Sequence, residues 1–199
     1  SLASTLLYYE SRGELWERQM LIKARPVAGD IPLGERFLAR IVPFVYPRTF
    51  LHHPAEYISR MKARIEVSVG TEENVKLMPG GIRDIEFIVQ SLQLINGGAA
   101  PAIRERGTLP ALALCERAGY ISAGEAARLV PAYTFLRTLE HRLQMAENAQ
   151  THTLPTDPAA LDLVARKCGE ADGASLRRKL EEHRRNVRSV FERVLSVPE

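Results

Sequence analysis

Residues 76–87 hold the residue types in this sequence that are best suited to chemistry. The segment contains a Pro-Gly-Gly turn, and two basic residues, Lys76 and Arg83, flank Gly80 and Gly81. A glycine turn that leads directly into a helix can leave backbone N–H groups free at the positive end of the helix dipole, where phosphate or carboxylate binds. Lys76, Gly80, Gly81 and Arg83 are therefore candidates for an anion- or nucleotide-binding site. The alternative is that the glycines only turn the chain.

Two carboxylates, Asp84 and Glu86, follow this turn. On a β-strand they would share one face and could hold Mg²⁺ for nucleotidyl transfer. On a helix, residues two apart point about 200° from each other and cannot share a metal. Residues 82–95 are too many for a typical strand and rich in helix formers, so we predict a helix. Because the histidines also lack ligand spacing and no nucleophile motif occurs, we predict neither a metal-binding nor a catalytic residue.

The predicted helix carries a narrow polar stripe on an otherwise apolar surface, formed by Arg83, Glu86, Gln90 and Gln93. A matching stripe on the helix expected at 122–149 includes Arg137, Glu140 and Gln144. A helix that is apolar nearly all round is buried, so its polar groups need partners. We predict that the two helices pack together, with Glu86 pairing to Arg137 and Arg83 to Glu140. A buried network that also includes Asp84, Gln90 and Gln144 is one interpretation, and a polar cleft for a ligand is the other.

Helical periodicity dominates the chain and no alternating run indicates a strand, so the predicted fold class is all-α. We expect about eight helices, at residues 6–23 (broken near Gly13), 33–41, 55–69, 81–96, 108–119, 122–149, 157–168 and 175–195. Residues 43–47 are apolar between two prolines, which indicates a buried connector. Pro131 should bend the long helix or mark its effective start, and Ser122 and Glu125 have capping-box spacing.

The 199 residues are 45% apolar with a net charge of +3, which is typical of a globular protein. Residues 177–193 alone carry +4, so the basicity belongs to one terminal helix, whose arginines we expect on its solvated side. This argues against a nucleic-acid-binding surface. No apolar run is long enough to span a membrane, and the start does not resemble a secretion signal. Two distant cysteines, Cys115 and Cys168, predict neither a disulfide framework nor a zinc site, and we expect a cytoplasmic location.

Several runs, taken together, resemble the bacterial glutamine synthetase adenylyltransferase family. They are Trp16–Gln19, Ile22–Asp30, Lys76–Gln90, Phe135–Gln144 and Gln150–Pro155. The string from Gly80 to Phe87 is the most specific of them. One departure is Met78, which stands where the family usually has glycine.

The resemblance implies a large enzyme of two related halves, each with a nucleotidyltransferase domain and a helical region. One half attaches AMP from ATP to a tyrosine of glutamine synthetase, and the other removes it by phosphorolysis. PII signal protein and glutamine control the direction. The runs at 135–137 and 150–155 resemble the N-terminal, de-adenylylating half.

The family's metal-binding carboxylates do not occur in this sequence, so the resemblance implies a fragment. Residues 1–48 would be the end of a nucleotidyltransferase domain, and residues 49–199 a helical bundle domain. Mg²⁺ and ATP or ADP are implied for the parent enzyme but not for this chain alone. Glutamine synthetase and PII are the implied partners. Read without the resemblance, the chain is a non-catalytic all-helical module that binds a protein partner through polar grooves. The resemblance implies that this partner would be glutamine synthetase or a PII-type signal protein.

Overall fold

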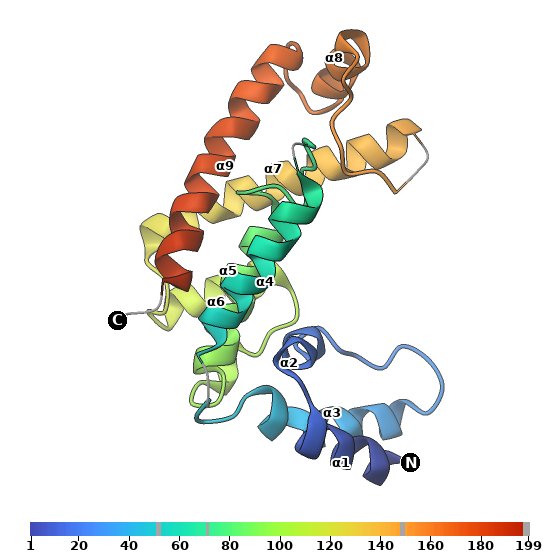
Figure 1. Cartoon of the computed structure of the whole chain (residues 1–199), viewed down its shortest axis with the longest axis vertical. Coiled ribbons are helices and arrows are strands. Elements are labelled where there is room, and N and C mark those ends of the chain that lie inside the picture. Colours follow the sequence, from blue (N-terminus) through green and yellow to red (C-terminus); the bar gives the residue numbers. More distant parts are fainter. Residues whose placement is uncertain (51–52, 71, 148–149, 197–199) are drawn as a thin grey trace.

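The computed structural model describes residues 1–50, 53–70, 72–147 and 150–196 (Figure 1). These residues form nine α-helices and one short 3₁₀ helix, and they contain an isolated bridge between Asn74 and Thr153 but no strand. The all-α prediction is confirmed. The helices are α1 (Leu2–Arg12), α2 (Leu15–Leu21), α3 (Ile31–Val45), α4 (Pro54–Val69), α5 (Ile82–Asn96), η1 (Pro101–Ile103), α6 (Thr108–Arg117), α7 (Ala123–Glu147), α8 (Pro158–Lys167) and α9 (Gly173–Leu195). The last two residues expected in the helix at 122–149 lie outside the described part.

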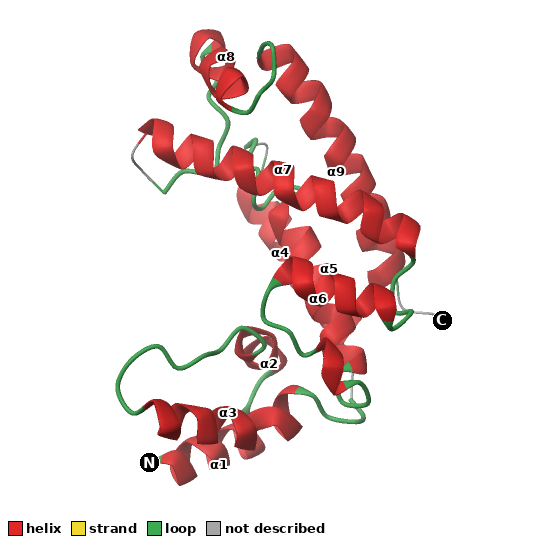
Figure 2. Cartoon of the chain, turned by 180° about the vertical axis from the view of Figure 1, so that it is seen from behind, coloured by secondary structure: helices red, strands yellow, loops and turns green. Residues whose placement is uncertain are grey.

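The break at Gly13 separates α1 from α2, which accounts for one helix more than the eight expected. Gly13 has extended backbone angles, and a Cβ atom there would lie 2.4 Å from the ring of Phe44. This close approach lets α1 and α2 both pack against α3. Figures 1 and 2 show α1–α3 gathered at one end of the fold and α8 at the other.

Helix α5 is the central element of the larger group, α4–α9. Eleven of its fifteen residues are buried, and it packs against α2, α4, α6, α7 and α9. The predicted packing of the helix that begins after Gly81 against the helix that holds Arg137 is therefore confirmed. Because α5 has so little solvated surface, its polar side chains must find partners on other elements.

The prediction of a connector at residues 43–47 is wrong, and Pro131 does not mark the start of the long helix; the alternative, a bend at Pro131, stays a prediction. Helix α3 continues through Pro43 to Val45, where a connector was expected, and α7 begins at Ala123 and includes Pro131. Each proline removes one backbone hydrogen bond, but it does not prevent the helix from continuing when packing favours it. Burial of Phe44 and Val45 supplies that packing in α3. The Ser122–Glu125 capping box at the start of α7 is confirmed, since each residue's side chain accepts from the backbone N–H of the other.

The arginines of α9 do not all lie on a solvated face, contrary to the prediction. Arg188 pairs with Glu66 at 2.8 Å, Arg184 donates to the Pro79 carbonyl at 3.0 Å, and Arg177 and Arg193 pair with Glu73 and Glu125. Helix α9 packs on α4, α5, α7 and α8, so long side chains at the edge of its apolar stripe reach neighbouring elements. None of the helices in the described residues is long and apolar enough to cross a membrane.

Candidate functional site

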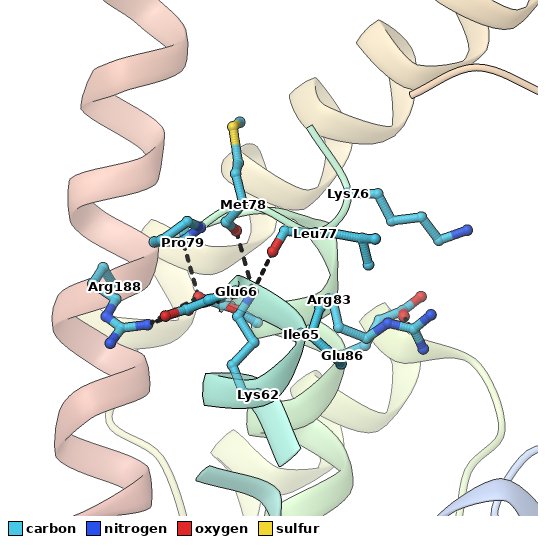
Figure 3. Close-up of polar contacts among 12 residues, drawn as sticks. Lys62, Ile65, Glu66, Lys76, Leu77, Met78, Pro79, Arg83, Glu86 and Arg188 are labelled. Atoms are coloured by element: carbon cyan, nitrogen blue, oxygen red, sulfur yellow. Dashed lines mark hydrogen bonds and ion pairs between the residues drawn. The ribbon is translucent and has the colours of Figure 1, made fainter. Parts of the chain in front are cut away.

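A buried ion pair holds the Pro-Gly-Gly turn against α4 and α5. Lys62 of α4 is 1% exposed and its Nζ lies 2.6 Å from Oδ1 of the fully buried Asp84. The same ammonium donates to the carbonyls of Leu77 at 2.7 Å and Met78 at 3.2 Å (Figure 3). Asp84 Oδ2 accepts from the N–H of Gly80 at 2.8 Å. One lysine and one aspartate thus fix both sides of the turn.

The ion pair continues to α9 and forms a network of two basic groups, Lys62 and Arg188, with three acidic groups: Asp84, Glu66 and the exposed Glu192, which lies 2.8 Å from Arg188. Arg188 Nη1 lies 2.8 Å from Glu66 and 3.8 Å from Asp84, and Glu66 lies 3.6 Å from Lys62. Burial raises the pKa of the Asp84 carboxyl, and the Lys62 ammonium is the largest of the contacts that oppose the rise. Asp84 is therefore fully engaged inside the protein and is not open to a metal or a substrate.

Lys62 is not among the site residues predicted from the sequence, although its position in the apolar pattern of α4 indicates a buried lysine. Ile58, Met61 and Ile65 mark the apolar side of α4, and Lys62 falls among them. A lysine on the apolar side of a helix needs a partner, because an unpaired buried charge is very costly. Its partner, Asp84, is 22 residues away in sequence, and only the packing of α4 on α5 brings the two together.

The expected free N–H groups at the Gly80–Gly81 turn are already hydrogen-bonded, so this part of the anion-site prediction is wrong. Besides Gly80, the bonds run from Gly81 to the Met78 carbonyl, from Ile82 to Val75 and from Arg83 to Lys76, at 2.9, 3.1 and 3.0 Å. Residues 75–78 fold back over the helix start and supply these carbonyls. A Cβ atom at Gly81 would lie 2.7 Å from the Val75 oxygen, so glycine permits this approach. Anion binding by the Lys76 and Arg83 side chains stays a prediction.

The expected ion pairs between α5 and α7 are not formed. Arg83 lies 3.8 Å from Glu86, and Arg137 lies 2.7 Å from Glu140, so each pairs with a neighbour on its own helix. Residues three apart on a helix are adjacent, and these contacts replace the predicted pairs Glu86–Arg137 and Arg83–Glu140. Figure 3 shows Lys76, Arg83 and Glu86 on the side of the cluster away from Arg188.

Glu140 is the centre of a second polar cluster. Its carboxylate is 2% exposed and lies 2.7 Å from Arg137, 3.0 Å from His152 Nδ1 and 3.7 Å from Lys76 Nζ. Burial lowers the pKa of the His152 imidazole and Lys76 adds to that effect, while Glu140 opposes it. The cluster joins α7 to the segments around residues 76 and 152. Gln144 is half-buried on the next turn of α7.

Gln90, the remaining member of the predicted network, belongs to neither ion cluster. Its Oε1 accepts from Gln19 Nε2 of α2 at 2.6 Å, and both side chains are buried. The predicted network is thus divided among three places: Asp84 faces α4 and α9, Gln90 faces α2, and Glu140 faces residues 76 and 152.

Replacing Glu140 should be clearly more damaging than replacing Glu86. Glu140→Gln removes the one carboxylate that three basic groups surround, at 2.7, 3.0 and 3.7 Å, and we expect a loss of about 1–3 kcal/mol in the free energy of unfolding. Glu86→Gln loses only one partly exposed contact to Arg83, worth about 0–1 kcal/mol. Urea unfolding of both variants at neutral pH measures the difference. Equal losses would show that the Glu140 cluster adds no stability beyond a surface pair.

A groove of about 440 Å³ lies between α2, α4 and α5. Its lining is mainly apolar with a few polar groups: Trp16, Gln19, Met20, Lys23, Met61, Ile65, Arg83, Phe87 and Gln90. Trp16 and Met20 are 47% and 51% exposed, whereas Glu17 and Gln19 on the same helix are buried. The apolar side of α2 therefore faces the groove and solvent, and this surface can accept an apolar group of a partner.

No metal centre can be built from the residues described. In 1–50, 53–70, 72–147 and 150–196 there is no group of three or more His, Cys, Asp or Glu side chains that could hold a metal ion. Asp84 and Glu86 lie on a helix, as predicted, and one is fully buried while the other is half-buried beside Arg83.

Comparison with known families identifies the chain. Residues 52–195 match the family model described as GlnD PII-uridylyltransferase. The chain belongs to this family. In this member of the GlnD PII-uridylyltransferase family, the matched residues include α4–α9. They therefore contain both the ion cluster around Lys62 and Asp84 and the one around Glu140. Residues 1–40 match a second model, described as Glutamate-ammonia ligase adenylyltransferase.

Relatives extend the likeness over nearly the whole chain. Proteins named bifunctional glutamine synthetase adenylyltransferase/adenylyl-removing enzyme are 43% identical over 92% of the chain in Rhizobium meliloti (strain 1021), 42% over 96% in Nitrosococcus oceani and 39% over 100% in Streptomyces avermitilis. The resemblance inferred from sequence is confirmed: the chain is a homologue of these enzymes. It spans about a fifth of the length of the curated relatives it matches, 19–20% of each.

Proposed function

We propose that this chain is the helical part of an enzyme that adenylylates glutamine synthetase and removes the AMP again by phosphorolysis. The observation that carries the proposal is the identity of about two residues in five, over nearly all of the chain, with relatives that bear this name. The match of residues 52–195 to a nucleotidyltransferase family supports the same class of chemistry. Its process would be the control of nitrogen assimilation, in the cytoplasm.

We further propose two parts for the chain, the end of a nucleotidyltransferase domain at 1–48 and a helical bundle domain at 49–199. The two family matches, at 1–40 and 52–195, support a division in this region. So does the grouping of α1–α3 at one end of the fold (Figure 2). The runs at 135–137 and 150–155 favour the N-terminal, de-adenylylating half of the parent enzyme.

We propose that this chain binds and positions the partners of the parent enzyme and does not itself carry out the chemical step. Nucleotidyl transfer needs Mg²⁺ held by clustered carboxylates and an ATP or ADP substrate. The residues here do not fit such a site, because Asp84 is paired with Lys62 and Glu86 points away from it. We assign the metal-binding carboxylates to a part of the parent enzyme outside this chain. Glutamine synthetase and a PII signal protein are the proposed partners.

The chain by itself should therefore show no phosphate-dependent release of AMP from adenylylated glutamine synthetase. A longer protein, which also contains the domain expected before this chain in the parent enzyme, should release AMP when phosphate and Mg²⁺ are present. Both proteins are purified from cells without the full-length enzyme and assayed side by side. Turnover above background by the short chain would contradict the assignment of the chemical groups to another part of the enzyme.

A second candidate function is a non-catalytic interaction module, and the groove beside Trp16 and Met20 favours it. Two exposed apolar side chains on one short helix are a feature of surfaces that meet a protein partner. Calorimetry with this chain separates the two functions. Binding of Mg²⁺ with ATP or ADP favours a retained part of a nucleotide site, whereas binding only to glutamine synthetase or PII favours the module.

A further inference from the structure

We propose that the pocket between the end of α2 and the loop before α6 binds a linked di- or triphosphate. This cationic pocket has a volume of about 520 Å³ and is lined by Lys23, Arg25, Arg104, Glu105, Arg106 and Gly107. It is built from residues of this chain alone, so the inference does not depend on the proposed function. One wall is formed by part of the run Ile22–Asp30. This run contributes to the family resemblance, but none of its residues belongs to the ion clusters described above.

The charge of the cationic pocket is unbalanced. Four of its six residues are basic, and none of the four forms an ion pair within the described parts of the chain. The single carboxylate, Glu105, accepts from the backbone N–H groups of Arg106 at 2.7 Å and Gly107 at 3.0 Å. The hydrogen bond from Gly107, and after it the one from Arg106, holds the pKa of Glu105 below its usual value. The carboxylate thus fixes the loop and forms no ion pair among the described residues, although the nearby charges of Arg106 and Lys23 also lower its pKa.

The walls of the pocket are held in place by buried contacts. Gln93 of α5 is 1% exposed, and its amide donates to the carbonyls of Ile103 at 2.7 Å and Glu105 at 2.6 Å. Arg104 donates from Nε to the Gly97 carbonyl at 2.7 Å, and its guanidinium lies 5.0 Å from the centre of the Tyr46 ring. These contacts leave the terminal guanidinium nitrogens of Arg104 without a protein partner among the described residues.

The lysine of the opposite wall is also oriented. Lys23 Nζ donates to the Arg106 carbonyl at 2.8 Å and to Thr108 Oγ1 at 3.0 Å. Burial lowers the pKa of Lys23, and the nearby Glu86 is the largest influence against that effect. An ammonium group has three N–H donors, so one remains for a ligand.

The size and charge of the pocket select the ligand class. A phosphate group carries about −1.5 to −2 charges at pH 7, so two or three linked phosphates match four cations better than one does. Guanidinium groups bind phosphate oxygens through pairs of parallel hydrogen bonds, and three of the four cations are arginines. The lining contains no large apolar side chain, which argues against a ligand held by burial of apolar surface.

The test measures binding of inorganic triphosphate, pyrophosphate and orthophosphate to the full chain by calorimetry at low ionic strength. The pocket variant is Arg25→Gln with Arg106→Gln, because both side chains are exposed and make no hydrogen bond in the described structure. The control is Arg178→Gln with Arg185→Gln on α9, which removes the same charge from two exposed arginines whose side chains form no hydrogen bond or ion pair within the described ranges. We expect triphosphate and pyrophosphate to bind more tightly than orthophosphate. Affinity for triphosphate should fall at least about tenfold in the pocket variant and less than about twofold in the control.

Equal losses in the two variants would overturn the proposal, because they would show attraction to net charge alone. Absence of triphosphate binding to the unaltered chain would overturn it as well. Circular dichroism checks that the pocket variant is folded; if it is not, Arg25→Gln alone gives the same test. A nucleoside diphosphate measured beside pyrophosphate identifies the source of the phosphates. Tighter binding of the nucleotide indicates a nucleotide ligand, and equal binding indicates a free oligophosphate.

Discussion

Lys62→Met should lower the free energy of unfolding by about 3–5 kcal/mol at neutral pH, because it leaves the buried Asp84 carboxylate without its main partner. The carboxyl group must then stay charged in a dry site or take up a proton, and both options favour the unfolded chain. The carbonyls of Leu77 and Met78 lose a donor at the same time. Urea unfolding followed by circular dichroism measures the loss.

The matched control is Arg60→Met on the same helix. Arg60 lies 3.6 Å from Glu56, and both side chains are largely exposed, so we expect a loss of about 0–1 kcal/mol. Adding Asp84→Asn to Lys62→Met should restore part of the stability, because it removes the stranded charge while an amide oxygen can still accept from Gly80. If Lys62→Met costs no more than Arg60→Met, the buried pair does not hold the turn.

Gly80→Ala should destabilise the protein by about 2–5 kcal/mol, through backbone strain and a steric clash together. Gly80 has a φ of 76°, which L residues rarely adopt. A Cβ atom there would also lie 2.3 Å from the backbone oxygen of Arg184 in α9. Backbone of a long packed helix cannot move aside easily, so the turn and α9 must separate. Thermal and urea unfolding give the size of the effect.

Gly119→Ala separates the two contributions in the same chain. Gly119 has a φ of 77°, but nothing lies within 4 Å of the position of an added Cβ atom. Only the strain remains there, and we expect a loss of about 1–2 kcal/mol. Similar losses at both positions would mean that α9 does not constrain the turn as closely as the structure shows.

Local pattern in the sequence was sufficient for the helices and for the family. Apolar spacing predicted a helix at 55–69 and the structure has Pro54–Val69, while the helix predicted at 81–96 is α5, which ends at Asn96. The capping box at Ser122 was predicted in the same way. Such features depend on contacts within about four residues along the chain, which a sequence displays directly. The end of α3 beyond Pro43 was missed because packing can outweigh the local cost of proline.

The partners of the charged residues were decided only by the tertiary structure. Helical spacing placed Gln90 and Glu140 in polar stripes of helices expected to be buried, and both side chains are buried, but it could not show what each one meets. Asp84 meets Lys62, Gln90 meets Gln19 71 residues away, and Arg188 of α9 meets Glu66 122 residues away. The cationic pocket likewise joins residues 23–25 to residues 104–107. A charge pattern indicates which residues need partners. Which partner each residue contacts depends on distances that are set only when the helices pack.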